Sequence, residues 1–205
     1  MKMILHNKVF NLLAILTFVS VLSSCDHTTQ PNLDTRQILP LVVSNSWTYA
    51  RTWSRLDSTV VDTVTMSITS KDTVQGVVGY NVNNLIIGPI LWFDMFMIDN
   101  RIDGLYMIKW PLTIPPTIPS ASKALSFPTN VGETNSFEGY LITTESIEQP
   151  VTVKAGTFQC VKYLVRLDTN VVGLIWSQPG VGFVRTWAQY GLVNYTHELT
   201  SYSLK

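Results

Sequence analysis

Residues from which catalytic and metal centres are built are scarce in this chain. It contains three histidines and two cysteines among 205 residues. No second histidine follows His197 at the spacing that zinc peptidases require, and neither a Gly-x-Ser-x-Gly motif nor a phosphate-binding glycine loop occurs. The sequence therefore predicts a protein that is not an enzyme and that uses no metal or cofactor.

Two short patterns imitate catalytic motifs. Ser120 and Lys123 match the Ser-x-x-Lys of penicillin-recognising enzymes, but that motif needs a helix, and Pro119 stands directly before it. Glu145 and Glu148 could form a carboxylate pair, yet three positions apart on a strand they would point to opposite faces. We interpret both patterns as coincidence.

Charge is also scarce. The chain has 14 basic and 14 acidic residues, so its formal net charge is zero. No cluster of basic residues occurs, and we expect no nucleic acid among its partners. Cys160 stands between the apolar residues Phe158 and Val161 and is expected to be a buried side chain rather than a reactive thiol.

The N-terminus has the organisation of an export signal. Two lysines come before a predominantly apolar run over residues 9–22, which at 14 residues is shorter than the roughly 20 that span a bilayer. The following Leu22-Ser23-Ser24-Cys25 resembles the lipobox of bacterial lipoproteins. The resemblance implies that residues 1–24 are a signal peptide and that Cys25 carries acyl chains such as palmitate. It also implies a lipid anchor in a membrane of the cell envelope, at the outer membrane or cell surface.

After the cysteine, a polar and turn-prone segment over residues 25–37 is expected to be a flexible tether. Residues 38–205 then suit a single domain. If Cys25 carries lipid, Cys160 has no disulfide partner, so burial of apolar side chains must stabilise this domain.

Beyond the tether, apolar and polar residues alternate with a period of two. The alternation is clear over residues 60–69, 161–168 and 193–199, whereas no segment after residue 40 has sustained helical periodicity. We therefore predict an all-β antiparallel meander that forms a half-barrel, a barrel or a sandwich, with little helix outside the signal peptide. The expected turns lie at residues 56–58, 71–72, 100–104, 155–156 and 179–180.

Two apolar segments need a separate interpretation. Residues 85–98 include Pro89 and Asp94 and are too few to span a membrane, so we expect a core strand there. Residues 111–119 contain four prolines, which exclude a central strand. This loop either packs against the sheet or forms a flap over a cavity, and both alternatives stay open.

Four blocks of sequence follow one another in a characteristic order. They are Pro-Leu with Trp-Thr-Tyr in residues 40–49, Phe-Pro and Val-Gly in 127–132, Val-Lys-Ala-Gly-Thr-Phe-Gln-Cys in 153–160, and Pro-Gly-Val-Gly within 176–185. Together they resemble an uncharacterised family of bacterial envelope lipoproteins and secreted proteins, with Ser44 and Lys154 in place of the usual glycine and proline. The resemblance implies a β-rich fold similar to the half-barrels of lipoprotein carriers, and it implies no activity.

Aromatic and arginine residues alternate on two predicted strands. Between residues 47 and 55, and again between 183 and 187, every second residue is aromatic or arginine, so these side chains would share a face. Such a face could stack on sugars or hold an acidic lipid head group. Alternatively, the rings pack inside the sheet while the arginines pair with Asp or Glu or point outward. The candidate binding residues are Arg51, Trp53, Arg55, Arg185 and Trp187.

These observations favour a non-catalytic cell-envelope lipoprotein that binds a lipid, a glycan or another amphipathic ligand on a concave sheet. The alternative is a structural or adaptor lipoprotein that docks an envelope protein through a sheet edge or the loop at 112–118. A hydrolase would require carboxylates, or a Ser–His pair, that the fold brings together from distant positions.

Overall fold

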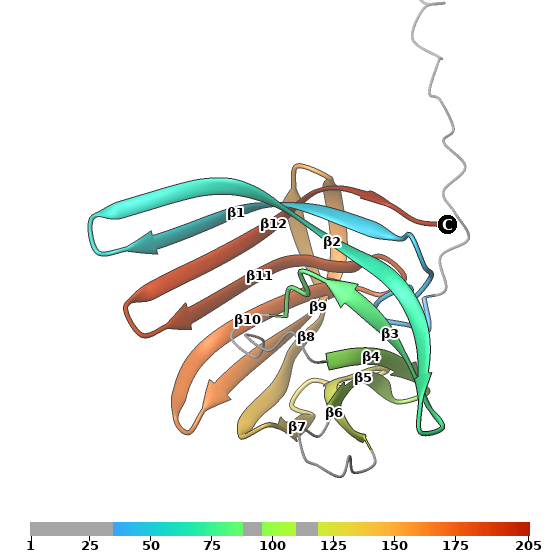
Figure 1. The fold of residues 1–205 in the computed structure, drawn as a ribbon. Helices are drawn as coiled ribbons and strands as arrows, with labels where there is room; N and C mark the ends of the chain where they lie inside the picture. Colours follow the sequence, from blue (N-terminus) through green and yellow to red (C-terminus); the bar gives the residue numbers. More distant parts are fainter. Residues whose placement is uncertain (1–34, 88–95, 110–118) are drawn as a thin grey trace, which may run out of the picture. The chain divides into compact units, whose positions relative to one another are not determined.

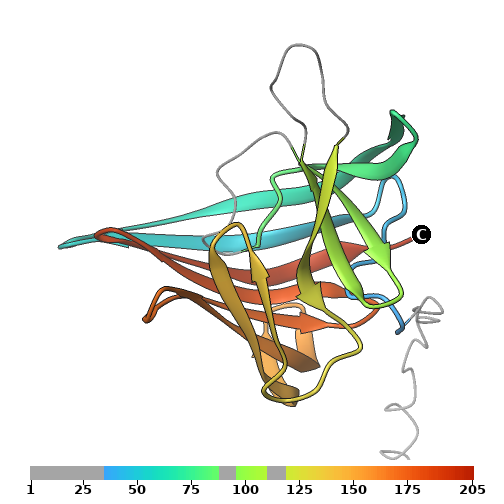
Figure 2. The same ribbon diagram turned by 90° about the horizontal axis from the view of Figure 1, so that it is seen from below.

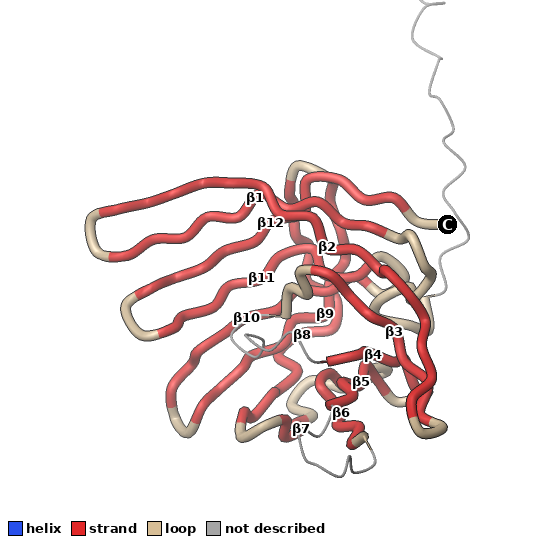
Figure 3. The backbone as a smooth tube through the Cα atoms, in the orientation of Figure 1, coloured by secondary structure: helices blue, strands red, loops and turns tan. Residues whose placement is uncertain are grey.

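The computed structural model describes residues 35–87, 96–109 and 119–205, and within these ranges the chain is all β (Figures 1 and 3). Twelve strands form one antiparallel sheet, and the same ranges contain no helix that is long and apolar enough to cross a membrane. The strands are β1 (Ser46–Arg55), β2 (Ser58–Val74), β3 (Val77–Asn83), β4 (Phe96–Arg101), β5 (Gly104–Lys109), β6 (Ser120–Ser126), β7 (Thr134–Phe137), β8 (Tyr140–Val153), β9 (Gly156–Leu167), β10 (Asn170–Gln178), β11 (Gly182–Tyr190) and β12 (Val193–Ser203).

The sheet is a meander whose two edges approach each other (Figure 2). Its strand order is β6-β5-β4-β3-β2-β1-β12-β11-β10-β9-β8-β7, so the first and last strands of the chain pair at its centre. At the edges, Asn135 on β7 donates from Nδ2 to the carbonyl oxygens of Lys123 (3.0 Å) and Ala124 (3.2 Å) on β6. A side chain thus bridges the seam between the edges, and the fold is a nearly closed barrel. The predicted all-β meander is confirmed.

Four of the five predicted turns are confirmed, at residues 56–57, 102–103, 154–155 and 179–181. The turn predicted at 71–72 is wrong, because β2 continues to Val74 and the chain reverses at Gln75 and Gly76. These two residues have φ values of 49° and 81°, the positive φ that tight hairpin turns favour.

The strand predicted over residues 85–98 is confirmed only in its last part. Ile86 and Ile87 are buried outside any strand, and β4 begins at Phe96. Residues 88–95 are not among those that the structure describes, and neither are residues 110–118 of the proline-rich loop. Pro119 at the end of that loop is buried.

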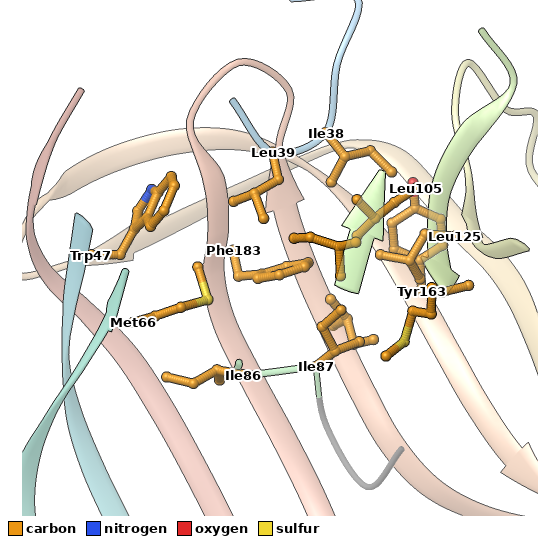
Figure 4. Close-up of a cluster of buried hydrophobic side chains, with 14 of the residues drawn as sticks. Ile38, Leu39, Trp47, Met66, Ile86, Ile87, Leu105, Leu125, Tyr163 and Phe183 are labelled. Carbon is orange, nitrogen blue, oxygen red and sulfur yellow. The ribbon is translucent and has the colours of Figure 1, made fainter. Parts of the chain in front are cut away.

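Apolar side chains from most strands fill the barrel (Figure 4). The segment before β1 closes one end, which we call the closed end. There Gln37 O accepts a hydrogen bond from Gly180 N (2.7 Å) and Leu39 O accepts one from Asn100 Nδ2 (2.6 Å). The buried cluster comprises Ile38, Leu39, Leu41, Trp47, Tyr49, Met66, Ile68, Ile86, Ile87, Ile98, Leu105, Met107, Ala124, Leu125, Phe137, Ile142, Val161, Tyr163, Val165, Ile175, Val181, Phe183 and Leu199.

Trp47 and Tyr49 fix β1 inside the barrel. Both are fully buried, and their polar atoms are bonded: Trp47 Nε1 donates to Val181 O at 2.6 Å and Tyr49 OH to Phe183 O at 2.9 Å. Gly182 stands between these two acceptors with a φ of 112°, and a Cβ there would lie 3.2 Å from Trp47 Nε1. The second glycine of the Pro-Gly-Val-Gly block therefore permits this close approach.

The turn before β1 forms even though it lacks a glycine. Ser44 has a φ of 79°, a conformation that glycine adopts more readily than serine. Asn45 is fully buried and holds the turn. Its Nδ2 donates to Pro40 O (2.9 Å) and its Oδ1 accepts from Lys205 N (2.8 Å), so the C-terminus is tied to the start of β1.

Candidate functional site

Away from the closed end, three long hairpins (β1–β2, β11–β12 and β9–β10) project from the barrel, and we call this end the mouth (Figure 1). The inner face there is organised in rows, because directly paired residues on neighbouring antiparallel strands share a face. Arg51 is opposite Asp62 on β2 and His197 on β12, and His197 is opposite Thr186 on β11. We call these four residues the polar row.

A second row lies one step nearer the hairpin turns. Trp53 is opposite Val60 on β2 and Tyr195 on β12, and Tyr195 is opposite Ala188 on β11. We call these four residues the mouth row. One step in the other direction, Tyr49 is opposite Val64 and Leu199, which belong to the core. The polar row therefore separates the core from the mouth row.

The polar row is internally paired. Arg51 Nε donates to Asp62 Oδ1 at 2.8 Å, and Arg51 Nη2 donates to Asp62 Oδ2, so that the pair is bidentate. The hydrogen bonds from Arg51 lower the pKa of Asp62 below its ordinary value of 3.8. The two side chains keep 37% and 40% of their surface exposed.

His197 completes the row as an uncharged group. Burial lowers the pKa of this histidine from 6.5 to about 4, and the charge of Arg51 acts in the same direction. Its Nδ1 lies 3.1 Å from Thr186 Oγ1, and its ring meets the Tyr49 ring edge-on at 6.5 Å between centroids. The row at neutral pH therefore contains one cation, one anion and two neutral polar groups.

The structure divides the five residues of the predicted binding surface between two faces. Arg51, Trp53 and Arg55 share the inner face by alternation, with Arg55 exposed at the end of β1. Arg185 is opposite Glu198, the neighbour of His197 in the chain, so Arg185 and Trp187 lie on the outer face. The interpretation of all five residues as one surface is wrong.

A β-bulge explains this error. Ser177 on β10 is opposite Phe183, whereas the preceding Trp176 is opposite Arg185, so β11 has one extra residue, Val184. Because of this insertion, Phe183 points into the core while Arg185 two positions later does not. Simple alternation, which we used on the sequence, does not show where a bulge lies.

Arg185 has a structural environment on the outer face. Its Nη2 lies 2.8 Å from Glu198 Oε1 and 3.2 Å from the carbonyl oxygen of Thr152, and its guanidinium carbon lies 6.0 Å from the centre of the Trp176 ring. Thr152 belongs to the end of the β8–β9 hairpin, so Arg185 connects that hairpin to β11 and β12. The outer cluster formed here comprises Val151, Cys160, Trp176 and Val184 with Val153, Phe158, Leu174 and Trp187 at its margin.

Sequence reasoning missed several members of the inner face. Asp62 interrupts the apolar series of Val60 and Val64, and this interruption was the signal for a charged group on the inner face. His197 was considered only as a metal ligand, and Tyr195 only as part of an alternating strand. No local signal shows that Thr186 faces His197, because that contact depends on how β11 and β12 pair.

The other candidate chemical groups have structural roles. Ser120 and Lys123 lie on strand β6 rather than on a helix, and Lys123 Nζ is 2.6 Å from Asp103 Oδ2. Burial raises the pKa of the Cys160 thiol to about 12, in agreement with the expected buried cysteine. Among the residues that the structure describes, no group of three or more His, Cys, Asp and Glu side chains could hold a metal ion.

No protein-family model and no curated protein matches the chain. Two solved structures are similar to it. One is a "putative exported protein with YmcC-like fold" from Bacteroides fragilis NCTC 9343, with 12% identity and a TM-score of 0.40 over 81% of this chain and 98% of the other. The second is a "putative lipoprotein" from Parabacteroides distasonis ATCC 8503, with 13% identity and a TM-score of 0.40 over 85% of this chain and 100% of the other. At this similarity neither structure assigns a family or a function to this chain.

Proposed function

We propose that this chain is a lipid-anchored protein of the cell envelope that is not an enzyme and that binds an amphipathic ligand at the mouth of its barrel. Cys25 is the proposed attachment site of the lipid, after removal of residues 1–24 as a signal peptide. These residues are not among those described, so the lipobox-like sequence alone supports the anchor. Two or more acyl chains hold a protein stably on a membrane, because each buried methylene contributes about 0.8 kcal/mol.

The observation that carries the binding function is that the inward side chains of β1 change from buried and apolar to partly exposed and polar toward the mouth. The core residue Tyr49 is fully buried, whereas Arg51 and Trp53 at the following inward positions of the same strand are partly exposed. Charged groups on the inside of a barrel are costly unless they are paired or serve a ligand. A partly exposed inner surface with aromatic rings and a few fixed polar groups is typical of a binding site.

A docking function is the second candidate, and the hairpin turns at the mouth favour it. Leu56 in the β1–β2 turn and Leu192 in the β11–β12 turn are 78% and 66% exposed. Exposed apolar side chains on neighbouring hairpins are a feature of protein contact surfaces. A photo-cross-linker at position 56 in intact cells would capture an envelope protein if this candidate is right, whereas recovery of the chain alone would reject it.

The anchor is tested by blocking lipoprotein processing. Globomycin should cause a larger precursor to accumulate, and the Cys25→Ser variant should leave the membrane fraction. Cys160→Ser is the matched control, because it removes a thiol that is buried in the fold, and it should stay with the membrane. Normal maturation and unchanged membrane association of Cys25→Ser would contradict the anchor.

The binding function is tested without knowledge of the ligand by hydroxyl-radical footprinting. In intact cells, Trp53 should be oxidised more slowly than in the full chain extracted into detergent, because a ligand covers the mouth. Trp187 on the outer face is the internal control and should be oxidised at equal rates in both samples. Equal oxidation of Trp53 in cells and in the purified protein would reject the proposed binding function.

A further inference from the structure

The packing below the polar row restricts how deep a ligand can reach. Tyr49 and Leu199 lie one step from the polar row toward the core and are 0% exposed. Trp47 and Met66, one step further, are also 0% exposed. The Tyr49 hydroxyl is in addition bonded to Phe183 O. An alkyl chain would have to displace these side chains, which are packed at the density of a protein interior. A ligand at the mouth therefore makes its contacts with the polar row and the mouth row.

The β1–β2 hairpin offers no net charge to a ligand. Between the core positions Tyr49 and Val64, this hairpin has two cations and two anions. They are Arg51 and Arg55, and Asp57 and Asp62. His197 is neutral at physiological pH because burial lowers its pKa to about 4. An anionic ligand on the remaining donors of Arg51 would lie beside the Asp62 carboxylate, and the two negative charges would repel each other.

The Arg51–Asp62 pair is suited to hydroxyl groups. A guanidinium has five N–H donors, and only those on Nε and Nη2 are directed at Asp62, so further donors remain. Each carboxylate oxygen likewise keeps a second acceptor site. Donors and acceptors thus lie side by side in a fixed geometry on two strands. A hydroxyl group both donates and accepts, and a polyol can therefore satisfy both kinds of site.

Aromatic rings lie directly beside this pair. Trp53 and Tyr195 are opposite each other in the mouth row and are partly exposed. A sugar ring has one face rich in C–H groups, and burying that face on an aromatic ring is favourable while its hydroxyls stay hydrogen-bonded. From this juxtaposition we infer that the mouth binds an uncharged saccharide, with a sugar face on Trp53 and its hydroxyls on the Arg51–Asp62 pair. The inference deepens the proposed function and rests on it.

The experiment uses the full chain extracted from membranes in a detergent without a sugar head group. Isothermal titration calorimetry is carried out with short oligosaccharides of glucose, mannose, galactose and N-acetylglucosamine. Uronic-acid oligosaccharides, sodium palmitate and phosphatidylglycerol vesicles are the comparison ligands. At least one neutral oligosaccharide should bind, and Trp53→Ala and Asp62→Asn should each weaken its binding about tenfold or more, which corresponds to 1.4 kcal/mol.

Matched controls come from the outer face. Trp187→Ala and Glu198→Gln remove a tryptophan and one acid of an arginine pair without touching the mouth, and binding should be unchanged. Trp53→Phe keeps an aromatic ring and should retain most of the affinity, which separates loss of stacking from loss of folding. Near-ultraviolet circular dichroism checks that each variant keeps its tertiary structure.

Three results would overturn the inference. One is tighter binding of uronic-acid oligosaccharides, palmitate or phosphatidylglycerol than of any neutral oligosaccharide. Another is saccharide binding that is insensitive to Trp53→Ala and to Asp62→Asn, which would place the sugar elsewhere. The third is protection of Trp53 in cells without binding of any neutral oligosaccharide, which leaves the proposed binding function intact and rejects only the saccharide. Absence of protection in cells rejects the proposed function itself.

Discussion

Each face of the sheet has an arginine that pairs with a carboxylate, but the two arginines differ in their further contacts. On the inner face, Arg51 forms a bidentate pair with Asp62. On the outer face, Arg185 pairs with Glu198, but it also bonds the carbonyl of Thr152 and lies over an indole ring. The side chains of the two pairs are about equally exposed, at 37% and 40% on the inner face and 32% and 45% on the outer face, so the additional partners of Arg185, and not its coverage, make the difference. Residue composition alone does not show which arginine connects distant parts of the fold.

The largest expected difference between the faces is in stability. Trp47→Ala should lower the free energy of unfolding by about 3–5 kcal/mol, because it removes a fully buried indole and orphans the Val181 carbonyl. Trp187→Ala on the outer face, where the indole is only partly buried, should cost about 1–2 kcal/mol. Urea unfolding of both variants measures the two costs. Equal costs would show that the outer cluster stabilises the protein as much as the barrel core does.

The polar row should make stability depend on pH. His197 titrates near its ordinary value of 6.5 when unfolded and at about 4 in the fold, because burial disfavours its charged form. Between these values the unfolded chain binds more protons, so the stabilisation from neutral His197 is complete above pH 6.5 and is lost as the pH falls toward 4. The total effect is on the order of 3 kcal/mol.

Urea unfolding between pH 4 and 7 measures this slope. His197→Gln removes the titrating group and should flatten the curve in this window, although its stability at pH 7 can differ. A slope that persists in the variant would show that other groups cause it. Trp187→Ala, which removes no titrating group, is the control from the outer face and should leave the slope as it is.

A smaller effect is expected where Arg185 connects the β8–β9 hairpin to the outer face. Arg185→Ala should cost about 1 kcal/mol, because the ion pair is partly exposed and a single hydrogen bond to Thr152 is lost. Hydrogen exchange should become faster in residues 149–158. Arg51→Ala, which removes the corresponding arginine from the inner face, should leave exchange in that hairpin unchanged. The opposite result would reject the structural role of Arg185.

At Cys160 only an upper limit is expected for the change in stability. Burial raises the pKa of its thiol to about 12, so a thiol reagent at neutral pH should modify it only as fast as the protein opens. Cys160→Val should change the free energy of unfolding by less than about 1.5 kcal/mol, because it replaces one small buried apolar group by another. Rapid modification of the native thiol would show that the outer cluster opens readily.

Most of the fold was predictable because it depends on local patterns. The period-two alternation marked strands, and glycine or Asx residues marked four of the turns. The turn at Gln75 and Gly76 was missed because Lys71 and Asp72 are polar residues of a long strand, and polarity alone does not end a strand. The sandwich and the half-barrel stayed open as alternatives, because closure depends on contacts such as that of Asn135 with β6, which join residues far from any local signal.

The candidate site was predictable only in part. Arg51, Trp53 and Arg55 were found because they share one strand, and alternation holds along it. Arg185 was assigned to the same surface because no sequence pattern shows the extra residue in β11. Asp62 could have been found, since a charge that interrupts an apolar series is costly unless it is paired.

The sequence by itself determined the all-β class, four of the turns and the apolar face of the strands with regular alternation, because these follow from the backbone period and from residues within a few positions of one another. It also contains the lipobox-like segment on which the proposed anchor rests. Only the tertiary structure decided which face each arginine occupies and which partners meet in the polar row. The face of each arginine and the partners in the polar row depend on the pairing of residues as distant as Arg51 and His197 and on the bulge in β11. Neither the pairing nor the bulge can be recognised from the alternation of apolar and polar residues.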